Sequence, residues 1–134
     1  MNTNYTYDKG KRPETSSARE VYTLVKSIKD KEQEIVILLC LDSRNKVISK
    51  NIVFIGTLNH SVVHPRDVLR IAILNNANSV ILAHNHPSGD VNPSVDDRDI
   101  TKKLKKACEL IGIPLLDHVI VGQGFYSFQD KGEL

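Results

Sequence analysis

The side chains best suited to chemistry gather in residues 83–97, which read AHNHPSGDVNPSVDD. His84 and His86 are separated by one residue, and in an extended strand such side chains point to the same side. Asp97 follows eleven positions after His86. Imidazole nitrogens and carboxylate oxygens are zinc ligands, and three protein ligands leave a fourth position for water, as in catalytic zinc sites. The three residues are therefore candidate ligands of a catalytic zinc (Zn) site.

Ser94 and Asp97 also have a purely structural interpretation. The stretch SVDD, residues 94–97, has the S-x-x-D arrangement in which a serine hydroxyl and a carboxylate satisfy the backbone N–H groups at a helix start. This arrangement needs no metal, and a histidine pair alone is weak evidence for an ion. The combination of H-x-H with S-x-x-D at a fixed spacing is what favours a metal site.

Apolar patterning predicts the elements that position these residues. Helical spacing predicts helices within residues 15–30, 64–76 and 94–112. Short apolar runs predict strands at residues 34–42, 46–56, 79–84, 114–122 and 124–128. The order α-β-β-α-β-α-β-β indicates an α/β fold in which helices flank one mixed sheet. The inner stripe predicted for the third helix comprises Ile100, Leu104, Ala107, Cys108 and Ile111.

Length and composition restrict the class of protein. A chain of 134 residues with 40% hydrophobic and 25% charged residues is typical of one globular domain. We expect residues 1–14 to form a flexible or loosely docked N-terminal arm and residues 15–134 to form the domain. A net charge of +2 is weak support for a nucleic-acid partner. Without an apolar run that could span a bilayer, we expect a cytoplasmic protein with no membrane partner.

The spacing H-x-H-x7-S-x-x-D at His84, His86, Ser94 and Asp97 resembles the metal-binding core of the JAMM (JAB1/MPN/Mov34) metalloprotease family. The wider text is similar to the RadC branch of that family, in the segments GTLNHSVVHPRDVL, ILAHNHPSGDVNPSVDDRDITKKL and IGIPLLDHVIVG. The resemblance runs from about Ser16 to the end of the chain. It implies a cytidine-deaminase-like JAB/MPN fold with three layers, a mixed sheet between flanking helices.

The resemblance also implies roles for individual residues. His84, His86 and Asp97 would bind zinc, and Ser94 would steady the oxyanion that forms during hydrolysis. A glutamate before an early strand would act as general base on water, and KEQEIVILLCLD offers Glu34 directly before the apolar run. Many RadC-like sequences have an acidic residue where this chain has Asn51, so this position departs from the pattern. A base supplied by that second strand would be missing here.

Three further residues are candidates for substrate binding or for contacts that orient a ligand. Arg66, in the segment HPR, could bind a substrate carboxylate, or it could be a surface residue at a helix start. Asp117 and His118 could orient a metal ligand or line the cleft. A buried histidine satisfied by ordinary hydrogen bonds is an equally good interpretation of His118.

These observations favour a zinc-dependent hydrolase of amide bonds, either peptide or isopeptide, with an unknown peptide or protein substrate. Two alternatives belong to other classes: a DNA-repair-associated accessory or nuclease-like RadC protein, and a metal-binding interaction module without turnover. Nucleobase deamination is disfavoured because its H-x-E and P-C-x-x-C ligand motifs are absent from the sequence. The sequence identifies neither the substrate nor the oligomeric state.

Overall fold

The computed structural model describes residues 4–56 and 63–134. A six-stranded sheet has the order β1-β3-β2-β4-β5-β6, in which only β4 and β5 run parallel. The strands are β1 (Asn4–Thr6), β2 (Glu34–Leu41), β3 (Val47–Gly56), β4 (Ser79–Asn85), β5 (Leu115–Gly122) and β6 (Gly124–Ser127). The helices are α1 (Ala18–Val25), α2 (Pro65–Leu74) and α3 (Val95–Ile111), with short 3-10 turns at Lys9–Lys11 and Lys26–Ile28.

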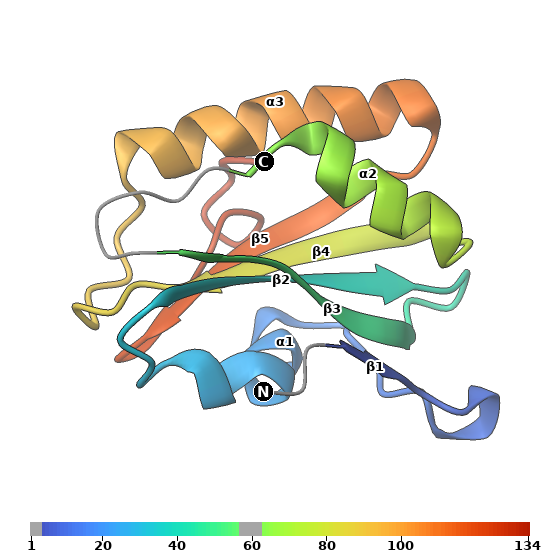
Figure 1. The fold of residues 1–134 in the computed structure, drawn as a ribbon, viewed down its shortest axis with the longest axis horizontal. Helices are drawn as coiled ribbons and strands as arrows, with labels where there is room; N and C mark the ends of the chain where they lie inside the picture. Colours follow the sequence, from blue (N-terminus) through green and yellow to red (C-terminus); the bar gives the residue numbers. More distant parts are fainter. Residues whose placement is uncertain (1–3, 57–62) are drawn as a thin grey trace.

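The elements form three layers, as Figure 1 shows, with α2 and α3 on one face of the sheet and α1 on the other. Alternate residues of the central strands supply two separate cores. Ile81 and Ala83 of β4 belong to the core on the α1 face. Val80 and Leu82 belong to the core beneath α2 and α3. The α/β fold, with one mixed sheet between flanking helices, is confirmed.

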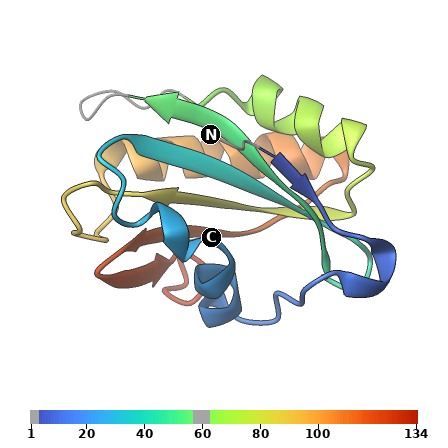
Figure 2. The same cartoon turned by 60° about the horizontal axis from the view of Figure 1, so that its bottom comes forward.

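The first described residues, from Asn4 onwards, run along an edge of the sheet. Asn4–Thr6 pair with β3, and the Tyr7 N–H donates to the Ile48 carbonyl at 2.9 Å. Figure 2 shows this segment beside β3, at the opposite sheet edge from β6. Residues 1–3 of the predicted arm lie outside the described residues, and the flexibility of residues 1–14 stays a prediction. No helix among the described residues is long and apolar enough to cross a membrane.

Helix α3 is turned about its axis relative to the predicted inner stripe. Leu104 and Cys108 are buried as expected, but the other buried residues of the helix are Asp97 and Thr101. Ile111, predicted to be internal, is 50% exposed. The prediction followed apolar residues alone, whereas the first two turns bury polar groups that are paired with histidines. Gly112 ends the helix in the left-handed conformation, which favours glycine.

Candidate metal centre

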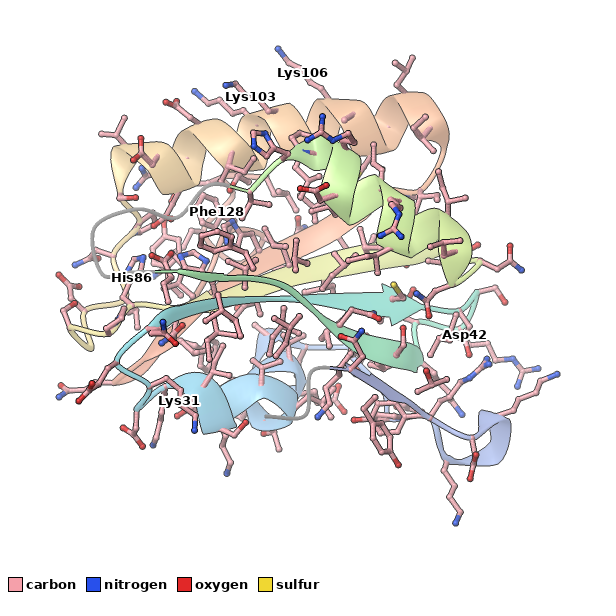
Figure 3. The ribbon with its side chains drawn as sticks, viewed as in Figure 1. Lys31, Asp42, His86, Lys103, Lys106 and Phe128 are labelled. Atoms are coloured by element: carbon pink, nitrogen blue, oxygen red, sulfur yellow. The ribbon has the colours of Figure 1, made fainter. Side chains whose placement is uncertain are left out.

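The end of β4 presents two imidazoles to the face covered by α3. His84 is the second-last residue of the strand, and it has the same parity as Val80 and Leu82 in the core beneath the helices. His86 follows the strand, and its N–H donates to the Val121 carbonyl of β5 at 3.2 Å. The chain is thus still extended along the sheet at His86, which gives both histidines the same orientation. Figure 3 shows His86 at the end of the sheet that lies under the start of α3.

A short loop returns the chain from His86 to the start of α3. Gly89 has a φ of 85°, a left-handed conformation that favours glycine. Its carbonyl accepts from the Gln123 N–H at 3.0 Å, which ties the loop to the β5–β6 turn. A Cβ atom at Gly122 would lie 2.6 Å from the same carbonyl oxygen, so only glycine permits this close approach. This contact with the β5–β6 turn therefore fixes the position of the loop that follows the histidines.

The start of α3 combines the two interpretations of Ser94 and Asp97. The Ser94 hydroxyl accepts from the Asp97 N–H at 3.0 Å, and the Asp97 carboxylate accepts from the Ser94 N–H at 2.9 Å, which makes a complete capping box. The same Asp97 oxygen, Oδ2, lies 2.9 Å from His86 Nε2. Capping therefore fixes the rotamer in which this carboxylate faces the histidines.

Among the described residues, His84, His86 and Asp97 form a group that could hold a metal ion. His84 Nε2 lies 3.1 Å from His86 Nε2 and 3.1 Å from Asp97 Oδ1. Two tetrahedral ligands at the usual zinc distance are separated by about 3.3 Å. The distances from His84 Nε2 to these two atoms are thus close to that separation, and all three ligand atoms lie within 4.8 Å of one another.

Hydrogen bonds at the far side of each ring fix the tautomers. His86 Nδ1 lies 2.7 Å from the Asp90 carbonyl oxygen, which can only accept, so Nδ1 carries the proton. His84 Nδ1 lies 2.7 Å from His118 Nε2. If His84 donates there, each of the two histidines, in its neutral form, presents an unprotonated Nε2 to the common centre. Such outer hydrogen bonds are the usual way in which metal-binding histidines are oriented.

The direction of the His84–His118 hydrogen bond follows from Thr101. The Thr101 hydroxyl donates its single proton to the Asp97 carbonyl at 2.6 Å, so the proton between Thr101 and His118 Nδ1, 2.6 Å away, belongs to the ring. A neutral His118 then has a bare Nε2, which accepts from His84. Burial, together with the neighbouring His84, lowers the pKa of His118 well below its ordinary value, which keeps the ring neutral. The ring also stacks on Phe128, with centroids 4.9 Å apart.

Glu34 is the acidic residue from the early strand that reaches this cluster. It is the first residue of β2, and its Oε1 lies 3.6 Å from His84 Nε2. Asn51 lies elsewhere: its amide donates to the Leu38 carbonyl at 3.3 Å and to the Ser49 hydroxyl at 2.9 Å. The described residues that line the cleft over the cluster include Glu34 and do not include Asn51. The departure from the family pattern at Asn51 therefore does not remove the carboxylate at the metal centre.

The cluster lines an open cleft of about 670 Å³. Ser94 also lines it and is hydrogen-bonded to Asp97. The other described residues that line it are Val36, Val63, Leu82, Pro87, Ser88, Asp90, Asn92, Asp96, Ile100 and His118. The cleft thus offers both apolar and polar side chains to a ligand that reaches the metal centre.

The carboxyl group of Asp97 is strongly biased towards its charged form. Burial acts to raise its pKa, but hydrogen bonds from His84 and His86 outweigh that effect and hold the pKa well below its usual range. The pKa of His86 is raised: burial would lower it, but the contact with Asp97 dominates. The donor set is thus a carboxylate with two imidazoles, which is suited to zinc and less suited to magnesium.

Two of the predicted site residues lie away from the cleft. Arg66 is at the start of α2 with its side chain 80% exposed, and its Nε is 3.7 Å from the Asp67 carboxylate. Asp117 is buried, and its carboxylate accepts from the Ser127 hydroxyl at 2.5 Å and from the N–H groups of His118 and Gln129. Neither is among the described residues that line the cleft. A substrate-binding role for Arg66 stays a prediction, and the contacts of Asp117 join β5 to the turn after β6.

Sequence reasoning missed Thr101 and Asn85. Thr101 lies four residues after Asp97, hence on the same helix face, and a polar residue there was a signal that could have been used. Asn85 stands between the two histidines and points to the other face of the sheet, where it contacts the segment before β2. Alternation along the strand predicts its direction but not its partner.

Comparison with known proteins places this site in a family. A model of the RadC-like JAB domain matches residues 15–133. A UPF0758 protein of Thermotoga maritima is 49% identical over 119 residues, which cover 88% of this chain and 54% of that protein. A UPF0758 protein of Methanosarcina barkeri is 44% identical over 118 residues, 87% of this chain and 52% of the relative. A third, of Streptococcus equi subsp. zooepidemicus, is 42% identical over 123 residues, with 91% and 55% covered.

The chain spans about half the length of the curated relatives it matches. The match to the family model includes every candidate ligand, the glutamate at the start of β2 and the serine at the start of α3. The chain belongs to the RadC-like JAB domain family.

Proposed function

We propose that this chain is a zinc-dependent hydrolase of amide bonds, acting on a peptide or isopeptide bond in a peptide or protein substrate. The observation that carries the proposal is the position of Glu34, whose Oε1 is 3.6 Å from His84 Nε2, at the edge of a three-ligand group. A site with only a structural ion would need no further carboxylate facing the open side. Glu34 lines the cleft, where a substrate carbonyl and a water molecule have access.

His84, His86 and Asp97 would hold the ion. Zinc in such a site acts as a Lewis acid that makes water a better nucleophile at neutral pH and polarises a carbonyl group. The chain's own contribution to this step is orientation, because Asp90 and His118 contact Nδ1 of the two rings and leave Nε2 of each neutral ring as the nitrogen that can bind an ion.

Glu34 and Ser94 would carry the proton transfer and the charge stabilisation. The Glu34 carboxylate takes a proton from the attacking water as the new carbon–oxygen bond forms. It returns that proton to the amide nitrogen as the carbon–nitrogen bond breaks, so the products are a carboxylic acid and an amine. The Ser94 oxygen accepts from the Asp97 N–H, and a serine hydroxyl can donate its own proton at the same time. Donation to the developing oxyanion is worth about 10²–10³ in rate in comparable sites.

The test compares Glu34→Gln with the unchanged chain, using a mixture of internally quenched peptides and a pair of peptides joined by an isopeptide bond. Glutamine keeps the size of the side chain but cannot take up the proton, so we expect kcat to fall by at least about 10²-fold. Zinc content, measured by metal analysis of protein purified without added metal, should stay near one equivalent in both proteins. Equal turnover by the two proteins would contradict the role of Glu34.

A metal-binding module without turnover is the outcome in which zinc is bound but neither protein cleaves any probe. The DNA-associated alternative has a separate test, which is retention of duplex DNA with a steep dependence on salt concentration. The lysines of α3 give it little support, because Lys103 and Lys106 extend from the helix away from the sheet and the cleft, as Figure 3 shows.

A further inference from the structure

We infer that Asn85 is a positioning residue that holds Glu34 over the metal centre, a role that rests on the proposed function. Asn85 is 0% exposed and lies between two metal-ligand candidates in the sequence. It is not among the described residues that line the cleft. Its side chain instead forms hydrogen bonds to the backbone on both sides of Glu34.

The contacts of Asn85 enclose the start of β2. Its Oδ1 accepts from the Ile35 N–H at 2.6 Å. Its Nδ2 donates to the Gln33 carbonyl at 3.0 Å and makes a longer contact of 3.4 Å to the Lys31 carbonyl. The residues directly before and directly after Glu34 are thus bound to one buried amide group, about fifty positions later in the chain.

These hydrogen bonds from Asn85 to Ile35 and Gln33, here termed the Asn85 clamp, lie where the pairing of β2 with β4 ends. The last residue pair between β2 and β4 is Val36 with His84. Ile35, one step further along, is bound by the Asn85 side chain in place of a backbone partner on β4. The segment before it, Lys31 to Gln33, is exposed, and Figure 3 shows Lys31 in the connection between α1 and β2. In the strand pairings, Glu34 is matched with Gly56 of β3, whereas the pairing of β2 with β4 ends at Val36.

The register of this segment decides which face Glu34 occupies. Val36 packs in the core beneath α2 and α3, whereas Ile35 and Ile37 pack on the α1 face. Glu34 therefore shares the face of Val36 and His84. A slip of one residue would turn the carboxylate to the opposite face, and a displacement of about 1 Å in a reacting group can cost about 10²-fold in rate. A clamp on both neighbours prevents both changes.

The three consecutive residues 84–86 thus have two separate roles. His84 and His86 point to the α3 face and supply nitrogen ligands, while Asn85 points to the other face and fixes the residue that acts on water. Because these tasks are physically separate, loss of the Asn85 amide should move the general base and leave the ligands in place.

The test uses Asn85→Ala, with Asn51→Ala as its matched control. Asn51 is also a buried amide that donates to a backbone carbonyl of β2, but it lies outside the cleft. We expect Asn85→Ala to lower kcat by about 10- to 100-fold on the cleaved probe peptide, with KM and zinc affinity within about threefold of the unchanged chain. Asn51→Ala should keep its kcat within about threefold, although it also loses buried hydrogen bonds.

Other outcomes overturn the inference. If kcat and zinc affinity fall together in Asn85→Ala, the residue supports the ligands and does not position Glu34. If Asn51→Ala loses as much kcat, the loss reflects a general loosening of the sheet.

A measurement on the unchanged chain keeps the inference testable if Asn85→Ala does not fold. The Ile35 amide should exchange its hydrogen slowly, as do amides in the interior of β2, although it lies beyond the last pair with β4. Exchange as fast as in the exposed 31–33 segment would show that the clamp is absent in solution. If the unchanged chain binds zinc and cleaves no probe, the proposed function fails, and slow or fast exchange at Ile35 still decides whether the clamp exists.

Discussion

Two buried aspartates in this molecule have nearly the same exposed fraction, but their pKa values are shifted in opposite directions. Asp97 is 8% exposed and Asp117 is 7% exposed. Asp97 caps α3 and faces two imidazoles, which lower its pKa strongly against the effect of burial. Asp117 is surrounded by a hydroxyl and two backbone N–H groups, and burial raises its pKa above the ordinary value. Burial alone therefore does not distinguish a ligand from a structural residue.

The difference lies in what remains open around each carboxylate. Asp117 is not among the described residues that line the cleft, and its hydrogen bonds join β5 to the end of β6 and the turn after it. Asp97 uses one oxygen in its capping box, yet both oxygens also face nitrogens of histidines that line the cleft. A metal-ligand site is marked by oxygen and nitrogen atoms that can bind an ion and that converge on an open space.

The largest expected effect is on zinc binding by Asp97→Asn. Asparagine keeps a carbonyl oxygen that can accept from the Ser94 N–H, so the capping box is largely preserved. It removes the negative charge that draws the ion to the two histidines. Because even a lost outer partner costs about 10- to 100-fold in metal affinity, we expect a loss above about 100-fold, measured by competition with a chromophoric chelator.

The matched variant is Asp117→Asn, which changes the same atoms in the other buried aspartate. Its zinc affinity should stay within about threefold of that of the unchanged chain, since Asp117 contacts none of the three ligands through its side chain in any described hydrogen bond. Similar losses in the two variants would mean that the cluster is not the binding site.

The second effect concerns the hydroxyl that links the two regions. Thr101→Val keeps the shape of the side chain but removes the acceptor for His118 Nδ1–H, which frees the His118 ring to adopt the other tautomer. His118 Nε2 would then be protonated and would no longer accept from His84. We expect zinc affinity to fall by about tenfold, whereas Thr101→Ser, which keeps the hydroxyl, should stay close to the unchanged chain. Equal affinities of the valine and serine variants would refute the proposed order of hydrogen bonds.

The elements and the local geometry of the metal centre could be predicted from sequence because they depend on short-range rules. Alternation along a strand orients His84 and His86, and the capping pattern orients Asp97. The order of helices and strands was also predictable, since each element has its own apolar period and ends at turn residues. Pro65 begins α2 and Gly112 ends α3, which are positions that favour proline and glycine.

The contacts between distant elements could not be predicted in the same way. Thr101 meets His118 only because α3 lies across β5, and Asn85 meets Ile35 across fifty residues of chain. The burial of α3 shows the same limit. Its inner face was assigned from apolar residues, but the hydrogen-bonded network at Asp97 and Thr101 turns a polar surface inward and leaves Ile111 half exposed. A pattern of apolar residues does not include the energy of paired polar groups, so it does not predict their burial.

The smallest expected effect is on the stability of Asp117→Asn, and it depends on pH. The folded-state pKa of Asp117 is raised above the unfolded value by burial. Its contribution to the free energy of unfolding is therefore fully present below the unfolded pKa, near about pH 4, and is lost as the pH rises through the folded pKa. Asparagine does not ionise, and it can accept from the His118 and Gln129 N–H groups while it donates to the Ser127 hydroxyl. The variant thus avoids that loss.

We therefore expect the unfolding free energy of Asp117→Asn, relative to the unchanged chain, to become more favourable between about pH 4 and neutral pH. The two proteins should differ by no more than about 1 kcal/mol, because every hydrogen bond of the carboxylate has a counterpart in the amide. Urea unfolding of the metal-free proteins at several pH values measures this difference. A relative stability that falls as the pH rises would show that Asp117 is stabilised in its charged form, as Asp97 is, and the contrast between the two carboxylates would then rest on their access to the cleft alone.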